Sequence, residues 1–78
     1  MRASILLPEL GAAPVVLSVW FADIGDVVYE GDRLVEVRAP GATFDVPAPA
    51  TGRLTAKHAW PNDPLQPGQL LGEVEVVE

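Results

Sequence analysis

Residues 16–37, VLSVWFADIGDVVYEGDRLVEV, determine the architecture of this chain, because their pattern is repeated later in it. A shift of 37 residues lays them, without a gap, over RLTAKHAWPNDPLQPGQLLGEV, residues 53–74. The 7 identical pairs among the 22 positions are Leu17/Leu54, Ala22/Ala59, Asp26/Asp63, Gly31/Gly68, Leu34/Leu71, Glu36/Glu73 and Val37/Val74. Repetition at a fixed period, at turn and apolar positions alike, indicates a repeated structural unit. A coincidence of Gly and Leu at similarly spaced turns and strands is the alternative.

The whole chain has the pattern of an all-β protein. Short β-branched runs bounded by turn residues predict strands at Ser4–Leu7, Val15–Phe21, Leu34–Val37, Thr43–Val46, Arg53–Lys57 and Leu70–Val77. Glycine and proline recur between these runs, and no window of a dozen residues keeps a helical stripe without them. Each repeat is then a strand-turn-strand unit with an apolar face that it cannot bury alone. We therefore expect the two halves to cover each other in a sandwich with an internal two-fold.

The repeat also places the turn that joins the two halves. Gly41 maps onto position 78, so we expect the hairpin at one end of the sandwich and the chain termini at the other. Proline followed by glycine in APGA, residues 39–42, favours a type II turn. Two-residue hairpins usually prefer the primed turn types. We expect either that the two strands of the hairpin splay slightly at the tip or that their pairing ends further back, at Val37 and Phe44.

Length and composition limit the class of protein. Seventy-eight residues predict a single small domain, residues 1–78. A hydrophobic fraction of 49% predicts a folded chain, because there is enough apolar surface to offset chain entropy. The chain has no cysteine, which excludes disulfides, thiolate nucleophiles and zinc sites of cysteine type.

The charge and the apolar runs restrict the partners. The net charge of −6 repels phosphate backbones and anionic lipid, so nucleic acid is not expected as a partner. The acids are spread along the chain, as on a solvated face, and an acidic docking surface is the alternative. No apolar run approaches the roughly 20 residues that cross a bilayer, and Pro8 breaks the start too early for a signal peptide. We expect a cytoplasmic protein without membrane insertion.

Motifs over nearly the whole chain carry a family resemblance. In chain order they are LPELG at 7–11, Leu17 with Trp20, GDVV at 25–28, GDRLVEV at 31–37, AT at 42–43, VPAP at 46–49 and GRL at 52–54. Together they resemble the lipoyl domain of 2-oxo acid dehydrogenase acyltransferases, whose fold the biotinyl carrier domains share. The resemblance runs from about Leu6 to Val76. It implies a flattened all-β barrel or sandwich of two four-stranded antiparallel sheets related by a quasi two-fold.

The resemblance also implies an attachment site, from which this chain departs. In the family, a lysine at the tip of the hairpin between the halves carries lipoate or biotin through an amide. The lipoyl tip has Asp-Lys-Ala, commonly followed by Thr or Val, and the biotinyl tip has Met-Lys-Met. Here the attachment turn is Ala39, Pro40, Gly41 and Ala42, followed by Thr43, and Gly41 stands where the lysine would be. Glycine has no amine, so we expect no lipoate, no biotin and no other cofactor.

The other candidate sites are weaker. Lys57 is the single lysine and lies in a strand far from the hairpin tip. We expect a surface lysine, whose aliphatic stem could also lie across the end of the core beside Trp20, its partner in the repeat. His58 has no nucleophile beside it, so we expect a satisfied or exposed histidine. Glu36 and Asp45 could face each other across the hairpin, but nothing else indicates a general acid and base. With little concavity expected, we predict no catalytic residue, no metal site and no enzyme.

Three functions remain. The first is a non-enzymatic lipoyl/biotinyl-like domain that is unmodified and serves as an interaction or structural module for an unidentified protein partner. The second is a divergent lipoyl or biotinyl carrier linked to a multienzyme complex, modified at an unexpected position such as Lys57. The third is the lipoyl-like part of a membrane-fusion adaptor of an export pump. This chain resembles the lipoyl-like domains of such adaptors in that both lack the attachment lysine. That family, however, usually inserts a helical hairpin where this chain has Pro40-Gly41. The sequence leaves open the oligomeric state and whether descent is from a lipoyl or a biotinyl carrier.

Overall fold

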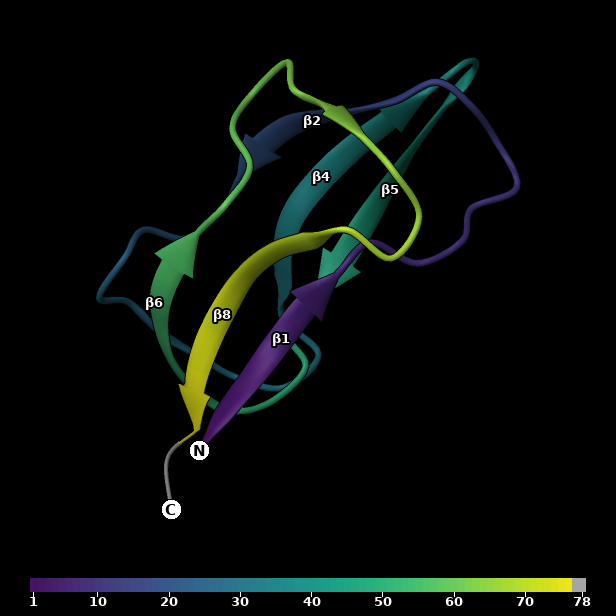
Figure 1. The fold of residues 1–78 in the computed structure, drawn as a ribbon. Helices are drawn as coiled ribbons and strands as arrows, with labels where there is room; N and C mark the ends of the chain where they lie inside the picture. Colours follow the sequence, from purple (N-terminus) through teal and green to yellow (C-terminus); the bar gives the residue numbers. More distant parts are fainter. Residues whose placement is uncertain (77–78) are drawn as a thin grey trace.

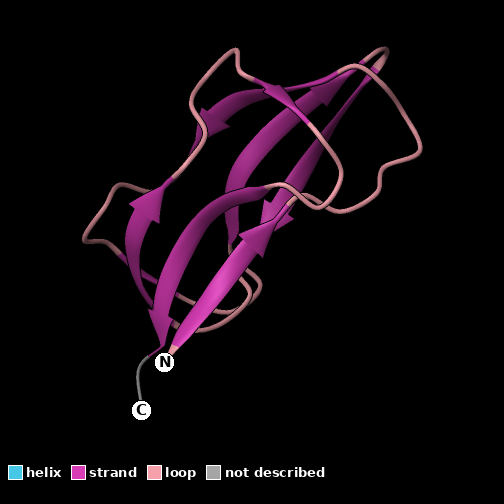
Figure 2. Ribbon diagram, in the orientation of Figure 1, coloured by secondary structure: helices cyan, strands magenta, loops and turns pink. Residues whose placement is uncertain are grey.

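A computed structural model describes residues 1–76, which form eight strands and no helix (Figures 1 and 2). This part of the chain therefore has no helix that could span a membrane. The strands are β1 (Arg2–Leu6), β2 (Val15–Trp20), β3 (Val27–Val28), β4 (Arg33–Ala39), β5 (Ala42–Pro47), β6 (Gly52–Lys57), β7 (Pro64–Leu65) and β8 (Leu70–Val76). The last predicted strand was expected to reach Val77, which lies outside the described residues.

The strands form two four-stranded sheets that face each other. One sheet has the order β1-β8-β6-β3, the other has the order β5-β4-β2-β7, and all neighbouring strands are antiparallel. The body measures 38 × 19 × 17 Å, so it is elongated along the strands. This arrangement confirms the predicted sandwich of two four-stranded antiparallel sheets.

The core lies between the sheets, where apolar residues alternate with exposed ones. β4 and β8 occupy equivalent places in the two sheets and have the same burial pattern, residue by residue. The largest fully buried side chains are all aliphatic: Ile5, Leu7, Leu17, Leu34, Leu54, Leu71, Val35, Val37 and Val74. Burying a side chain of this size stabilises the fold by about 1.5–3 kcal/mol. The described core holds no buried polar or charged residue.

The predicted repeat is present in the hydrogen bonds of the turns. The Leu17 amide donates to the Asp63 carbonyl at 3.1 Å, and the Leu54 amide donates to the Asp26 carbonyl at 2.9 Å. The Oδ2 atom of each aspartate also accepts a hydrogen bond from the backbone N–H three residues earlier. The N···Oδ2 distance is 2.8 Å in the first half and 2.9 Å in the second. Contacts conserved at the same offset show that the repeat is structural and not a coincidence of composition.

Two short strands were not predicted. β3 and β7 contain two residues each and form the outer edge of their sheets beside β6 and β2. Two residues are too few to show an alternating pattern. Pro64 in β7 is tolerated because an edge strand does not need every N–H for the ladder.

The hairpin and the amino terminus lie at opposite ends of the molecule, as the repeat predicted (Figure 1). At the terminal end, the Val76 amide donates to the Met1 carbonyl at 2.7 Å. The β4–β5 hairpin occupies the other end. Position 78, the predicted counterpart of Gly41, lies outside the described residues.

Candidate functional site

The β4–β5 hairpin closes tightly around Pro40 and Gly41. Pairing continues to Ala39 opposite Ala42, so the prediction that pairing could end at Val37 and Phe44 is wrong. Gly41 has a φ of +76°, which is the value that the third position of a type II turn requires. Proline supplies the preceding position with its fixed negative φ. The tip is a closed turn whose backbone geometry favours glycine.

The tip is open to solvent and carries no reactive side chain. Pro40, Gly41 and Ala42 are exposed. A Cβ added to Gly41 would have no other residue's atom within 4 Å apart from its chain neighbours. The place could therefore hold a larger side chain without a clash. The residues present offer no amine, nucleophile or acid at this turn.

Lys57 does not lie at the surface, where it was expected first. Its side chain is only 10% exposed, and it belongs to β6 in the sheet that does not contain the hairpin. Its Nζ lies 3.7 Å from the Asp23 carboxylate and 5.1 Å from the centre of the Trp20 ring. The expected placement of the stem beside Trp20 describes it better. An ion pair and a cation–π contact hold the amine at the end of the core.

Trp20 explains one asymmetry between the halves. Its indole N–H donates to the Ala59 carbonyl at 2.9 Å, and its ring lies 3.1 Å from where a Cβ on Gly72 would be. The counterpart of Gly72 in the first half is Val35, which is fully buried. Glycine in the second half thus leaves room for the tryptophan ring between the sheets.

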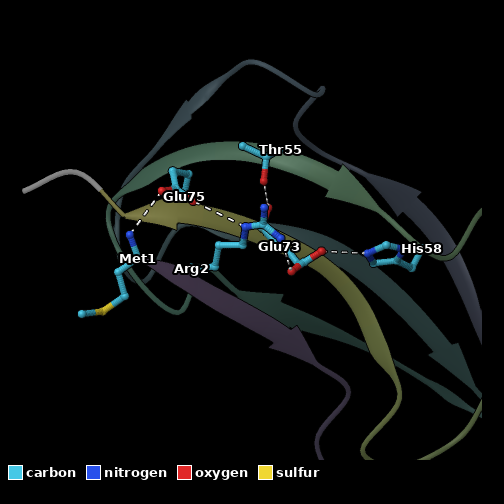
Figure 3. Close-up of polar contacts among 6 residues, drawn as sticks. All are labelled: Met1, Arg2, Thr55, His58, Glu73 and Glu75. Carbon is cyan, nitrogen blue, oxygen red and sulfur yellow. Dashed lines mark hydrogen bonds and ion pairs between the residues drawn. The ribbon is translucent and has the colours of Figure 1, made fainter.

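His58 belongs to a network of polar contacts on the outer face of the β1-β8-β6 sheet (Figure 3). His58 Nε2 lies 3.0 Å from Glu73 Oε2, and the other Glu73 oxygen lies 3.7 Å from Arg2. Arg2 also contacts Glu75, which pairs with the Met1 amine at 3.2 Å. The histidine is half-exposed and has a carboxylate partner, and the one hydroxyl drawn, that of Thr55, donates to the Glu73 carbonyl at 3.3 Å and not to the histidine. His58 is a surface hydrogen-bond partner of Glu73.

The carboxylates of the hairpin are separated from this network. Glu36 lies opposite Asp45 in the β4–β5 register, as predicted. Asp45 is within 3.8 Å of Arg33, which also lies over the Phe21 ring at 4.2 Å. A neighbouring cation thus offsets the like-charge pair. Residues 1–76 contain no group of three His, Cys, Asp or Glu side chains placed to hold a metal ion.

An open groove of about 700 Å³ lies beside the hairpin, although the sequence predicted little concavity. Glu9, residues 11–15 and residues 64–67 line it. Val15 is next to Val16, which pairs with Arg38, two residues before the tip proline. The groove and the hairpin tip therefore share one end of the molecule, where Figure 1 shows the β1–β2 loop.

The groove results from unequal loop lengths in the two halves. Leu7 and Ala48 are equivalent, since their carbonyls accept the Gly68 and Gly31 amides at 2.7 and 3.0 Å. Seven residues, 8–14, separate Leu7 from β2, but only three, 49–51, separate Ala48 from β6. The longer loop contributes residues 11–14 to the lining of the groove, together with residues 64–67. The difference in loop length can be counted in the sequence. It becomes visible only when β1 is aligned with β5, and the 37-residue shift does not align these two strands.

Comparison with known proteins gives consistent matches. A family model described as "Biotin-requiring enzyme", for biotin/lipoyl domains, matches residues 3–74. A lipoamide acyltransferase component of the branched-chain alpha-keto acid dehydrogenase complex of Pseudomonas putida is 31% identical over 92% of this chain. A dihydrolipoyllysine-residue succinyltransferase component of the 2-oxoglutarate dehydrogenase complex of Bartonella vinsonii is 34% identical over 96% of it. The chain spans only 18% and 19% of these two relatives.

A solved structure agrees with the fold. The lipoyl domain of the 2-oxoglutarate dehydrogenase complex from Azotobacter vinelandii has a TM-score of 0.68 to this chain. The comparison covers 88% of this chain and 86% of that domain, at 23% identity. At this identity the likeness concerns the arrangement of the strands alone.

Proposed function

The chain belongs to the biotin/lipoyl domain family, and we propose that it is a member that carries neither group and acts as a non-enzymatic interaction or structural module. One observation carries the proposal. The exposed turn where the resemblance expects an attachment lysine is Pro40-Gly41, which has no amine. An amide to lipoate or biotin needs that amine, so the group has nothing to attach to at this turn.

The surroundings of Lys57 support the proposal against modification at another position. A ligase that recognises a protruding turn would need a mobile, exposed lysine. The Lys57 side chain is 10% exposed and its amine is occupied by Asp23 and the Trp20 ring. Modification would break both contacts. The carrier alternative through Lys57 is therefore disfavoured.

The short hairpin argues against the adaptor alternative. β4 and β5 are joined by two residues, and no helix interrupts them. The relatives point elsewhere, because both are named as components of 2-oxo acid dehydrogenase complexes. We propose that the partner is a protein, and that components of such a complex are the first to test.

The experiment is co-expression with lipoate ligase and, separately, with biotin ligase, followed by intact mass. The native chain and Gly41→Lys are compared, with Gly41→Ala as the control that changes the same residue without adding an amine. We expect the native chain and Gly41→Ala to keep the mass of the polypeptide and Gly41→Lys to gain one acyl group.

Two other outcomes are informative. A modified native chain would overturn the proposal, and a Lys57→Arg variant would then show whether Lys57 is the site. If neither the native chain nor Gly41→Lys is modified, the surface that a ligase contacts has also diverged. The native chain would still be an unmodified module, with a structural or newly acquired binding role.

A further inference from the structure

β1 and β5 are equivalent edge strands, one in each sheet (Figure 1). Since Leu7 and Ala48 are equivalent, the five residues Arg2–Leu6 match residues 43–47 of β5. The two segments have the same burial pattern, residue by residue. The two edges can therefore be compared position by position.

The outer edge of β1 presents a row of backbone groups. In an antiparallel pair, each strand turns the N–H and C=O of alternate residues toward its neighbour and those of the residues between away from it. The Val76 amide donates to the Met1 carbonyl at 2.7 Å, which fixes this alternation in the β1–β8 register. The backbone groups of Arg2, Ser4 and Leu6 therefore point away from β8, and no strand among residues 1–76 pairs with β1 on that side.

The edge of β5 is blocked at the matching positions, whereas the edge of β1 is open. Pro47, the counterpart of Leu6, has no N–H, and Asp45, the counterpart of Ser4, adds an exposed charge. Proline and charged residues are common means by which an edge strand avoids pairing with another chain. At the same two positions β1 has an exposed serine and an exposed leucine. A further strand can therefore be added to β1 but not to β5.

We propose that β1 pairs with β1 of a second copy of this chain, in an antiparallel dimer with two-fold symmetry. Ser4 then lies on the two-fold axis, and Arg2 lies opposite Leu6 of the second copy. At each of these positions the two facing residues exchange two backbone hydrogen bonds, so the two β1-β8-β6-β3 sheets become one continuous sheet. The inference goes beyond the proposed function, because it does not depend on the hairpin or on a group attached there.

The sequence of β1, RASIL, selects a second copy as the occupant. In this register serine meets serine, alanine meets isoleucine, and the aliphatic stem of the arginine lies beside leucine. No like charges face each other. Pairing of β5 with itself would place Asp45 against Asp45 of the second copy, and pairing of β1 with β5 of another copy would lack the N–H of Pro47.

The net charge of −6 opposes this dimer only weakly at physiological salt. The body measures 38 × 19 × 17 Å, so two copies joined at their edges have centres about 19 Å apart, which exceeds two Debye lengths of about 8 Å. We therefore expect the dimer to strengthen as salt rises. Edge pairing buries little surface, so the dissociation constant should be weak, about 0.1–1 mM.

The test is sedimentation equilibrium of the native chain from about 0.05 to 2 mM, with NMR spectra at the same concentrations. We expect a reversible monomer–dimer equilibrium and concentration-dependent shifts of the Arg2, Ser4 and Leu6 amide signals. Raising NaCl from about 0.05 to 0.5 M should favour the dimer. In a mixture of isotope-labelled and unlabelled chains, the Leu6 amide of a labelled copy should show an NOE to Arg2 of an unlabelled copy.

Two variants transfer the blocking residues of β5 to β1. Ser4→Asp places two carboxylates opposite each other on the two-fold axis and should weaken the dimer about five-fold or more. Leu6→Pro removes an N–H that points away from β8, so no hydrogen bond within the domain is lost, and it should also weaken the dimer about five-fold or more. Thermal unfolding at the lowest concentration checks that each variant is folded, and Ser4→Asp decides alone if Leu6→Pro is not.

Thr43→Asp is the matched control. It adds the same charge to an exposed position of β5, opposite Arg38, on the edge that we expect to stay unpaired. This variant should keep the native dimerisation apart from the small effect of the added net charge. Ser4→Asp should therefore be the weaker dimer of the two.

The inference would be overturned by a monomer at all concentrations, by a dimer whose shifts lie outside β1, by a dimer that dissociates as salt rises, or by equal weakening in Ser4→Asp and Thr43→Asp. None of these results touches the proposed absence of lipoate and biotin, which the mass experiment decides. Conversely, a native chain modified by a ligase would remove the proposed function and leave the measurement of the dimer readable.

Discussion

Replacing Gly41 with lysine should lower the stability of the domain by about 1–2 kcal/mol and leave it folded. Gly41 has a φ of +76°, and a residue with a Cβ pays about 1–2 kcal/mol to adopt this left-handed conformation. No atom beyond the chain neighbours lies within 4 Å of the added Cβ, so a steric clash adds nothing. For a domain of this size, the change corresponds to a fall in Tm of roughly 4–16 °C.

Thermal and urea unfolding of the native chain, Gly41→Lys, Gly41→Ala and Gly41→Asn measure this effect. Lysine and alanine should lower the stability equally, because the strain comes from the backbone, and asparagine should lower it less because it tolerates positive φ. No loss in any variant would show that the turn does not need a positive φ. A loss above about 3 kcal/mol, beyond the cost of one strained residue, would show that the tip contributes packing that the structure lacks.

Three further predictions test the packing and the repeat by urea unfolding. Leu17→Ala and Leu54→Ala remove equivalent, fully buried side chains and should each lower the unfolding free energy by about 2–5 kcal/mol; a large effect at only one would contradict the equivalence. Gly72→Ala should lower it by about 1–3 kcal/mol, because the new Cβ would lie 2.6 Å from a carbonyl oxygen of β6, and unchanged stability would refute the close approach. Asp26→Ala and Asp63→Ala each remove one turn hydrogen bond, so each should lower the unfolding free energy by about 0.5–1.5 kcal/mol. Unequal losses would argue against equivalent turns in the two halves.

The repeat made the architecture predictable from the sequence. The identical pairs at turn and core positions implied two halves that bury each other, and β4 and β8 have the same burial pattern at the same offset. The hairpin position followed from the same alignment. β3 and β7 could not be predicted, because each is only two residues long and is defined by pairing with a strand from the other half.

The features that the sequence did not predict depend on contacts between distant segments. The ion pair that covers Lys57 was not predicted, because Asp23 comes from the first half and meets Lys57 only in the folded sandwich, whereas the neighbouring Trp20 was expected. The groove is lined by the long β1–β2 loop and by residues 64–67, and neither segment has a pattern of its own that indicates a cavity. The placement of glycine at the hairpin tip, by contrast, was visible in the sequence.

The intact mass of the native chain after saturating exposure to lipoate ligase and to biotin ligase shows whether the domain carries either group. We expect the mass of the bare 8.3 kDa polypeptide in both cases, because the hairpin tip offers no amine and Lys57 is held in the fold. A stoichiometric mass increase of one lipoyl or biotinyl group on the native chain would contradict it.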